Sequence, residues 1–577
     1  MKQTRHKLYL IATLLLLNIN INAFGFEVDG IYYNILSETD KTCEVTSGSS
    51  SDAYTGTVVI PEMVNHNNTD YTVIAIGDYA FQNYATITSV TIPNSITNIG
   101  QGAFRNCSAI KSLTIPNSVT TIEKYAFVNC SALTEINVEN GNKNYSSQDG
   151  VLFNYDKTTL VQYPGGKNGE YVIPNLVTTI GSWAFSDCSS LTGITIPNTV
   201  ATIEKYAFRY CSALTEIIIP NLVATIGDNA FEHCSSLTGI TIPNLVKIIN
   251  EGVFSGCSAL TSIKIPSSIT TIGNYAFSDC SSLTSITIPK SVTAIGEEVF
   301  TGCSDLTEIN VEEGNNNYCS FEGILFNYDK TRLIQCPQKK NGECIIPSTV
   351  INIGNYAFEH CYSLTNVKIP DSVTTIGDYA FSNCKSLTNI NIPNSVTMIG
   401  AYAFENCSSL TNINISNSVT TIGEWTFSYC SDITEITIPN SVTTIGKNAF
   451  YRCTDLNNIT IGSSVTTIER SAFSYCKSIK EIHTHATTPP NCNNKTFEEN
   501  IYSTASLYVP TGSLAAYQSA DVWKEFLNTK EFDPAGINNV TIDEGNGGKI
   551  IYDLNGNRLN TPQRGINIIN GKKVIVK

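Results

Sequence analysis

Charge is scarce in this 577-residue sequence, and positive charge is the scarcer kind. Charged residues make up 15% of the chain, and 35 Lys and Arg stand against 50 Asp and Glu, for a formal net charge of −15. Proteins that bind nucleic acids need clustered positive charge to attract phosphate groups. We therefore expect no nucleic-acid partner, and a surface that is largely neutral, polar and suited to hydrogen bonding.

Long hydrophobic runs are also missing. Beyond the first residues no run approaches the roughly 18 apolar residues of a membrane-spanning helix, so we expect no transmembrane span. The run at residues 8–17 is shorter, follows three basic residues and precedes Ala23 and Gly25. This order is typical of a secretory signal peptide, which we predict for residues 1–25. Because the first cysteine is Cys43, a lipoprotein anchor is not expected, and we predict a secreted or cell-surface protein.

Catalytic motifs are lacking too. The sequence contains no GxSxG, HExxH or phosphate-binding glycine loop. Of its six histidines, His483 and His485 lie near Cys476 and Cys492, but the spacing fits no metal motif. We predict no catalytic residue, no metal, no cofactor and no enzyme activity, with a hydrolase or transferase near the inserts described below as the less favoured alternative.

What the chain does contain is a repeat. Residues 191–213 read LTGITIPNTVATIEKYAFRYCSA, and the pattern LTxIxIPxxVxxIGxxAFxxCxx returns until about residue 482. Its phenylalanines mark fifteen repeats: Phe81, Phe104, Phe127, Phe185, Phe208, Phe231, Phe254, Phe277, Phe300, Phe358, Phe381, Phe404, Phe427, Phe450 and Phe473. A fixed period in the twenties is typical of a solenoid. We predict a leucine-rich-repeat-like parallel β-solenoid with about fifteen 23-residue rungs.

Each repeat supplies one rung. Leu191, Ile194 and Ile196 have the spacing of a strand with one buried face, which Pro197 ends. We expect a second short extended segment next, and then a tight or 3₁₀ turn that carries the Phe and the Cys. No rung can bury its own apolar face, so stacking stabilises the chain and both ends need caps.

The period breaks twice, at inserts covering about residues 139–172 and 312–346. The first insert contains VLFNYDKTTLVQYP and the second ILFNYDKTRLIQCP, so they are two copies of one module. We predict a β-hairpin that turns at residues 154–157 and either protrudes or enlarges one rung. The predicted organisation is an N-terminal β cap, repeats interrupted by the inserts, a C-terminal cap with a linker, and a small β-domain, at residues 26–75, 76–486, 487–536 and 537–577.

The repeat pattern resembles the BspA-like branch of leucine-rich repeats, found in surface proteins of anaerobic bacteria, over roughly residues 26–530. Pro, Gly, Ala-Phe and Cys fall in register in most repeats. The tail resembles the C-terminal sorting domains of type IX secretion, at residues 552–556 and 564–569. These resemblances imply cell-surface adhesion, binding of host matrix proteins or co-aggregation with other bacteria.

Fourteen of the nineteen cysteines share one position of the repeat: Cys107, Cys130, Cys188, Cys211, Cys234, Cys257, Cys280, Cys303, Cys361, Cys384, Cys407, Cys430, Cys453 and Cys476. Export would favour disulfides. Stacked equivalent cysteines do not readily reach the disulfide torsion, however, and buried thiols pack as small hydrophobes. We predict a free-thiol ladder and take Cys319, Cys336 and Cys344 as the favoured disulfide participants.

Two sets of outward residues are candidate binding sites for a host or bacterial protein or glycan. The first is an amide-rich strand face formed by Asn366, Lys368, Asn389, Asn391, Asn412 and Asn414. The second is an aromatic column two positions before the repeat Phe, formed by Tyr356, Tyr379, Tyr402 and Trp425. Mere solvation of a polar face and mere coverage of a corner remain the alternative interpretations. We expect an adhesin-like monomer, with a structural surface spacer as the alternative function.

The tail is predicted to be an address and not part of the rod, because it follows the cap and repeats none of its positions. Deleting residues 537–577 should therefore leave the melting temperature of the repeats unchanged in a thermal-unfolding measurement. A markedly lower melting temperature would mean that the tail is a structural cap.

Overall fold

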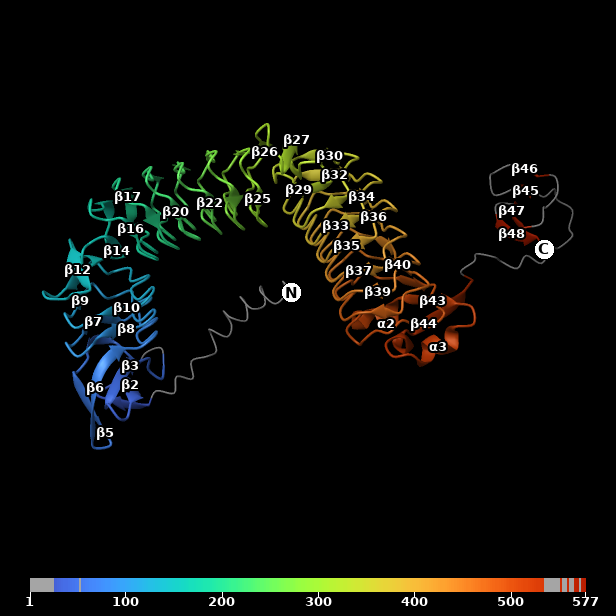
Figure 1. Cartoon of the computed structure of the whole chain (residues 1–577). Coiled ribbons are helices and arrows are strands. Elements are labelled where there is room, and N and C mark those ends of the chain that lie inside the picture. The colour runs from blue at the N-terminus through green and yellow to red at the C-terminus, as the bar shows by residue number, and fades with distance from the viewer. Residues whose placement is uncertain are drawn as a thin grey trace. The chain divides into compact units, whose positions relative to one another are not determined.

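The computed structural model describes residues 25–50, 53–533, 551–552, 558–559, 565–569 and 572–576. The chain forms a parallel β-solenoid in which each 23-residue repeat makes one rung (Figure 1). It divides into two compact units, Met1–Tyr328 and Asp329–Lys577, called unit 1 and unit 2 below and described separately. Residues 1–24 of the predicted signal peptide lie outside the described residues.

One ladder, called the main ladder, is built from the LTxIxIP segments, because alternate apolar residues of these strands point into the core. Where its consecutive strands pair, they pair in parallel. In unit 1 the strands are β4 (Gly56–Val59), β7 (Ile87–Thr91), β9 (Ser112–Ile115), β11 (Glu135–Val138), β15 (Gly169–Val172), β17 (Leu191–Thr195), β19 (Glu216–Ile217), β21 (Gly239–Ile240), β24 (Ser285–Ile288) and β26 (Glu308–Val311). In unit 2 they are β30 (Gly342–Ile345), β32 (Leu364–Lys368), β34 (Asn389–Asn391), β36 (Asn412–Asn414), β38 (Glu435–Thr437), β40 (Asn458–Ile461), β42 (Glu481–Thr484), β43 (Ser506–Pro510) and β44 (Asn528–Phe532).

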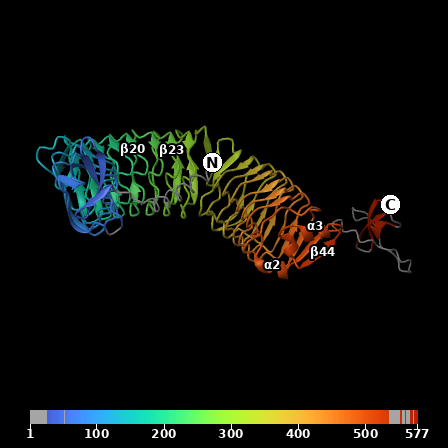
Figure 2. The ribbon, with the colours of Figure 1, turned by 90° about the horizontal axis from the view of Figure 1, so that it is seen from below.

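A second ladder, called the short ladder, is made by the Thr-Ile pair that precedes the repeat Gly. Its strands in unit 1 are β6 (Thr69–Ile76), β8 (Asn98–Ile99), β10 (Thr121–Ile122), β14 (Thr159–Gln162), β16 (Thr179–Ile180), β18 (Thr202–Ile203), β20 (Thr225–Ile226), β22 (Ile248–Ile249), β23 (Thr271–Ile272) and β25 (Ala294–Ile295). In unit 2 they are β29 (Arg332–Gln335), β31 (Asn352–Ile353), β33 (Thr375–Ile376), β35 (Met398–Ile399), β37 (Thr421–Ile422), β39 (Thr444–Ile445) and β41 (Thr467–Ile468). Figure 2 shows successive rungs lying side by side within each unit.

The described residues form about twenty rungs, and the prediction of fifteen was too low. The fifteen repeats were counted by their Phe, and the additional rungs have other residues at its position. Tyr54 packs against Phe81 at the N-terminal end, with ring centroids 4.9 Å apart, and Phe497 stacks on Phe473 at 5.5 Å near the C-terminal end. Each insert adds one more rung. The last rung of the solenoid is covered by aromatic residues of the C-terminal cap.

The inserts enlarge the solenoid by complete rungs. In the first, β12 (Tyr145–Gln148) pairs antiparallel with β13 (Val151–Asn154), and β13 pairs antiparallel with β14, which confirms the predicted hairpin. β14 then joins the short ladder in parallel with β16. In the second insert, β27 (Tyr318–Phe321) pairs antiparallel with β28 (Ile324–Asn327), as β12 does with β13, and both strands belong to unit 1.

Additional strands and helices lie at both ends of the repeats. Near the N-terminus β1 (Phe26–Val28), β2 (Ile31–Ser37) and β3 (Thr42–Thr46) pair antiparallel, β3 pairs in parallel with β6, and β5 (Met63–His66) pairs with β6. After the last repeat come α2 (Glu499–Thr504), α3 (Leu514–Ser519) and the 3₁₀ helix η1 (Trp523–Glu525). The Trp523 indole donates to the carbonyl of Pro490 at 2.8 Å. No helix in the described part of the chain is long and apolar enough to cross a membrane.

The tail contributes a separate four-stranded antiparallel sheet of β45 (Ile551–Tyr552), β46 (Arg558–Leu559), β47 (Gly565–Ile569) and β48 (Lys572–Val576). Most of residues 552–556, which resemble a type IX sorting domain, lie outside the described residues. The domain boundaries and the sorting role of this tail stay predictions.

Stacked phenylalanine rings form the core of both units. Phe208 lies parallel to Phe231 in unit 1 with ring centroids 5.3 Å apart, and Phe404 lies parallel to Phe381 in unit 2 at 5.1 Å. All fifteen repeat phenylalanines are buried. Offset-stacked rings at these distances are favourable beyond the apolar area that they bury. The repeat Phe therefore joins each rung to both of its neighbours.

The ladder cysteines are buried thiols with a defined partner. Twelve donate to the carbonyl of the Phe 26 residues earlier, at 2.9–3.2 Å, as Cys407 does to Phe381. Cys188 and Cys361 reach carbonyls of the insert rungs instead, at 3.8 and 3.7 Å. All described cysteines are free thiols. The column thus hydrogen-bonds across rungs without sulfur-to-sulfur bonds.

Of the two forms expected for the turn that carries the Phe, tight and 3₁₀, the structure has the tight one. Tyr206 and Tyr210, two positions before and after Phe208, have φ of 59° and 57°. Tight turns result, in which the amide of Cys211 donates to the carbonyl of Phe208. A left-handed residue on each side of the Phe reverses the chain more sharply than a 3₁₀ helix, which keeps negative φ values throughout.

Packing, and not cross-linking, should therefore dominate stability. Replacing Phe404 by Ala should lower the free energy of unfolding by about 3–5 kcal/mol, because it leaves a cavity between two rungs. Replacing Cys407 by Ala should cost about 1 kcal/mol, the loss of a weak hydrogen bond to a buried carbonyl. Urea titrations measure both. Similar losses in the two variants, or ladder thiols blocked to alkylation, would contradict the packing account.

Candidate binding surfaces

The amide face, defined as the six residues predicted from the sequence on β32, β34 and β36, is a single surface of unit 2. Asn366, Asn389 and Asn412 lie in register on adjacent strands, and Asn391 is in register with Asn414. The buried Ile or Val between the outward residues fixes this orientation, because side chains alternate along a strand. The structure therefore brings the predicted amide residues together.

Contacts within the amide face leave it neutral. Glu343 accepts a hydrogen bond from Asn366 at 2.8 Å and forms an ion pair with Lys368 at 3.1 Å, so the one cation of the set is balanced. Asn414 donates to Asn391 at 3.3 Å. Each amide has both donor and acceptor groups. Exposed amides on successive strands, about 4.8 Å apart, can hydrogen-bond to a ligand that runs across the rungs.

At its C-terminal end the same outward column changes character. Beyond Thr437 and Thr460 it continues with His483, Tyr508 and Lys530, in register on β42, β43 and β44. The His483 ring stacks on Tyr508 with centroids 4.3 Å apart, and Lys530 lies 5.8 Å from the centre of the Tyr508 ring. Sequence reasoning missed Tyr508 and Lys530, because the spacings of 25 and 22 residues that lead to them from His483 depart from the 23-residue period.

The histidines near this end pack against aromatic rings. His485 contacts the edge of Phe532 at 5.3 Å, and burial together with the charge of His483 lowers the pKa of His485. Within the described residues no group of three or more His, Cys, Asp or Glu side chains is placed to hold a metal ion. The histidine pair thus extends an aromatic surface.

The four residues predicted as an aromatic column form a continuous stack. Ring centroids lie 5.1 Å apart for Tyr356 and Tyr379, 4.6 Å for Tyr379 and Tyr402, and 6.0 Å for Tyr402 and Trp425, with interplanar angles of 6–9°. Because the ring faces cover one another, a sugar could stack on a ring face only at the ends of the column. Ring edges and hydroxyl groups remain for a partner.

The aromatic column also has an unusual backbone. All four residues have φ between 56° and 60°, a left-handed conformation that costs non-glycine residues about 1–2 kcal/mol each. Asn448 and Ser471 hold the same conformation at the same position of later rungs, so an aromatic side chain is not required for the turn. Ring stacking compensates for this cost, and the side chains are half-buried. Burial, followed by the charges of Glu424 and Glu405, raises the pKa of Tyr402 to about 12, so its hydroxyl stays protonated at neutral pH.

The column continues further than the sequence indicated. Trp425 contacts Tyr451 at 5.3 Å, and Tyr451 contacts Tyr429 at 5.6 Å and Tyr475 at 5.2 Å. Arg452 lies 5.1–5.7 Å from the centres of the three tyrosine rings. Tyr429 and Tyr475 follow the Phe of their repeats by two positions, so a search at the position before the Phe could not find them.

A depression of about 500 Å³ lies beside the aromatic column, on the short ladder of unit 2. Its lining includes Arg332, Asn355, Asp378 and Met398, of which Asn355 and Asp378 directly precede Tyr356 and Tyr379. Figure 1 draws the main and short ladders of unit 2 on opposite sides of the stack. The amide face and the aromatic column are therefore two separate candidate surfaces and cannot grip one small ligand together.

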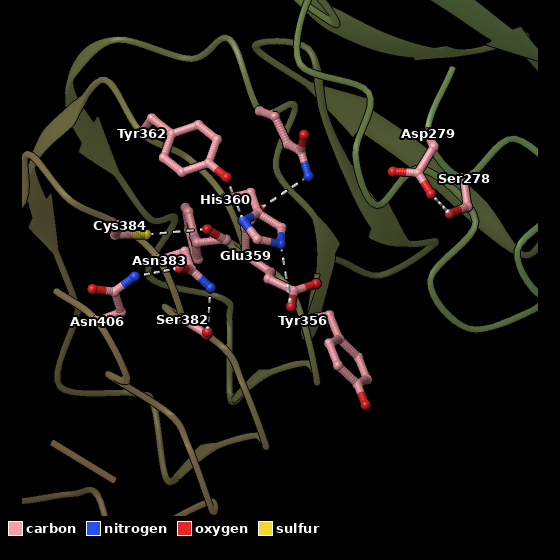
Figure 3. A network of polar contacts seen from close by, with 12 residues as sticks. Ser278, Asp279, Tyr356, Glu359, His360, Tyr362, Ser382, Asn383, Cys384 and Asn406 are labelled. Atoms are coloured by element: carbon pink, nitrogen blue, oxygen red, sulfur yellow. Dashed lines mark hydrogen bonds and ion pairs between the residues drawn. The ribbon is translucent and has the colours of Figure 1, made fainter. Parts of the chain in front are cut away.

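A polar network next to the Phe column is the arrangement most like a catalytic group. The Tyr362 hydroxyl lies 2.8 Å from Nδ1 of His360, whose Nε2 is 3.7 Å from Glu359 (Figure 3). Asn406 donates to Asn383 at 2.7 Å in the neighbouring rungs. Tyr362 is 42% exposed and a tyrosine hydroxyl is a poor nucleophile at neutral pH, so the network is better suited to joining rungs than to hydrolysis.

The half-buried Glu405 gives the region of the aromatic column a pH dependence. Burial raises the pKa of Glu405 above its ordinary value of 4.5. Between the unfolded and folded pKa values the folded state binds more protons, so stability falls as pH rises from about 4.5 through the folded pKa. Glu405→Gln should flatten this fall and raise the melting temperature at neutral pH. Glu435→Gln, at an exposed position, should change neither the pH dependence nor the melting temperature. An unaltered pH profile of the Glu405→Gln variant would refute the assignment of this pH dependence to Glu405.

Comparison with known proteins agrees with the repeat architecture. The family described as BspA type leucine-rich repeat region matches in six copies, over residues 63–164, 164–244, 224–341, 334–454 and 420–511. A search of curated proteins gives no match. Similar solved structures include a leucine-rich cell surface protein from Faecalibacterium prausnitzii A2-165, at 28% identity over 80% of this chain and 94% of that chain with a TM-score of 0.40.

Two further solved structures resemble the chain. A leucine-rich-repeat protein from Bacteroides ovatus ATCC 8483 is 24% identical over 88% of this chain and 100% of that chain, with a TM-score of 0.37. The pneumococcal vaccine antigen PcpA is 19% identical over 88% of this chain and 97% of that chain, with a TM-score of 0.36. Since the family matches extend from residue 63 to residue 511, the chain belongs to the BspA-type leucine-rich repeat family.

Proposed function

We propose that this chain is an exported surface protein that binds a protein or glycan partner through the amide face of unit 2. The observation that carries the proposal is the register of exposed amide side chains on β34 and β36, where Asn389 lies beside Asn412 and Asn391 beside Asn414. A repeated array of this kind presents the same donor and acceptor groups on successive rungs.

Family membership supports a protein-binding or surface role, since leucine-rich repeats present extended surfaces to partners. The neutrality of the amide face favours recognition by hydrogen bonds over capture of a charged ligand. In unit 1 the equivalent positions of β24 hold Ser285 and Thr287, whose side chains are shorter, and those of β26 hold Glu308 and a single amide, Asn310. The amides are thus concentrated on β34 and β36, two successive strands that carry two outward Asn residues each.

A second candidate surface is the short-ladder side of unit 2. The depression is lined by the carboxylate of Asp378, the guanidinium of Arg332 and the amide of Asn355, which suits a polar peptide segment. A structural spacer with no partner is the third possibility. Variants on the two sides of the rod separate these alternatives.

The test is a binding screen of the mature chain on protein and glycan arrays that include host matrix proteins and bacterial surface polysaccharides. We expect a partner whose affinity falls at least about tenfold, or about 1.4 kcal/mol, in the amide-face variant. That variant replaces four residues by Ala: Asn389, Asn391, Asn412 and Asn414. The matched control replaces four residues of the same columns in unit 1 by Ala, and should bind as the unaltered chain does: Thr241, Ser262, Ser285 and Thr287.

Two results would refute the proposal. Binding that survives in the amide-face variant but is lost on replacing Asp378 and Tyr402 by Ala would move the site to the short-ladder side. No retained partner on any array would favour the spacer. Melting temperatures of all variants establish that each remains folded, so loss of binding is not loss of structure.

A further inference from the structure

The two inserts differ at one pair of buried positions. Aligned at their common spacing of 173 residues, Tyr163 and Tyr171 of the first insert correspond to Cys336 and Cys344 of the second. The surrounding residues are nearly unchanged, since TLVQYP becomes RLIQCP and NGEYVIP becomes NGECIIP. Both members of the pair change together, and to the same residue type.

In the first insert the two tyrosines pack against each other. Tyr163 holds the Phe position of its rung, with its ring centroid 4.8 Å from that of Tyr171 and 5.0 Å from that of Phe185. Its amide donates to the carbonyl of Ala184, just as the amide of Phe185 donates to the carbonyl of Ala207 on the next rung. This aromatic contact ties the start of β15 to the end of β14.

In the second insert the same place holds two buried thiols. Cys336 and Cys344 are 0% and 2% exposed, and the amide of Cys336 donates to the carbonyl of Ala357, as that of Tyr163 does to Ala184. The Cys336 thiol lies 3.7 Å from the carbonyl oxygen of Pro337, and the thiols of Cys344 and Cys361 are close enough to influence its pKa. Replacing two rings by two thiols removes a large apolar contact that weak thiol hydrogen bonds do not restore.

The neighbouring cysteines are accounted for in other ways. Cys361 belongs to the thiol ladder, and its counterpart Cys188, in the repeat that follows the first insert, has tyrosines in place of the cysteine pair. Cys188 lies 3.8 Å from the carbonyl oxygen of Tyr163 and Cys361 lies 3.7 Å from that of Pro337, so each of these ladder thiols has a carbonyl partner in its insert rung. Cys319 replaces Ser146, and each donates to the carbonyl of the corresponding Asn, at 3.3 and 2.9 Å.

We propose that Cys336 and Cys344 form a disulfide that takes the place of the Tyr163–Tyr171 contact. The two thiols lose two electrons and two protons as the sulfur–sulfur bond forms, and a small-molecule or protein disulfide accepts them and becomes two thiols. The bond closes the seven-residue segment 337–343, which contains Lys339, Lys340 and Gly342, and fastens β30 to the end of β29.

Burial sets when this bond can form. Burial raises the pKa of the Cys336 thiol well above its ordinary value, which suppresses the thiolate that attacks a disulfide. The bond therefore forms while the rung is still open during folding, and is shielded from reductants once the rung is packed. Refolding the reduced chain with oxidised glutathione should form it readily, whereas adding the same reagent to the folded, reduced chain should form it slowly.

The test is peptide mapping of the full mature chain refolded with a glutathione redox buffer. Free thiols are alkylated in denaturant, and trypsin with a glutamate-specific protease cleaves after Lys340, Glu343 and Glu359, which puts the three cysteines on separate peptides. We expect a linked peptide of Cys336 and Cys344, with Cys361 alkylated. Alkylation of all three, or a linked peptide that contains Cys361, would overturn the proposal.

A variant pair provides the second readout. Cys336→Tyr combined with Cys344→Tyr restores the residues of the first insert. The melting temperature of this variant should be insensitive to reductant, whereas the melting temperature of the unaltered chain should be lower after refolding with reductant. Cys336→Ser with Cys344→Ser gives the same insensitivity if the tyrosine variant does not fold. Cys407→Ser, in the thiol ladder, is the control and should keep both the linked peptide and the sensitivity. A chain whose melting temperature ignores reductant in every form has no such bond.

Discussion

The constraint on which this structure depends is that each residue packs against its own counterpart one rung away. A side chain can therefore hold a position only if it is compatible with a copy of itself about 4.8 Å along the ladder. Phenylalanine rings meet this demand by stacking, as Phe404 does on Phe381, and thiols meet it by donating to the carbonyl of an earlier rung. Amides meet it by donating to one another, as Asn106 does to Asn83.

The same constraint explains the scarcity of charge. Like charges directly opposite each other on neighbouring strands are destabilising, so repeating a charged residue along a strand ladder is disfavoured. Some of the charges that do occur lie beside the opposite sign on the next rung, as in Lys205 with Asp228 and Arg209 with Glu232. Neutral Thr, Ser and Asn fill the remaining outward positions. The composition is thus a consequence of the stacking and not only a property of the surface.

Departures from the repeat are then informative, because stacking alone does not require them. The aromatic column holds bulky residues in a left-handed conformation that Asn or Gly would adopt more readily. The amide face replaces hydroxyls by amides on consecutive rungs of one unit only. The inserts exchange a tyrosine pair for a cysteine pair at corresponding buried positions. Each departure has a local physical explanation in packing or bonding, and each is a place where a partner or a covalent bond could act.

The sequence by itself determined the fold, since the period, the Phe column and the alternation along LTxIxIP each depend only on residues close in the chain. It also determined which residues of β32, β34 and β36 face outward. Only the tertiary structure decided that each insert adds a full rung. Tyr163 and Cys336 occupy the position at which the other rungs are recognised by their Phe. The tertiary structure also decided that the aromatic faces are covered and that the amide face and the aromatic column lie on different ladders. These features depend on contacts between rungs and on the path of the turns, which the spacing of residues within one repeat does not encode.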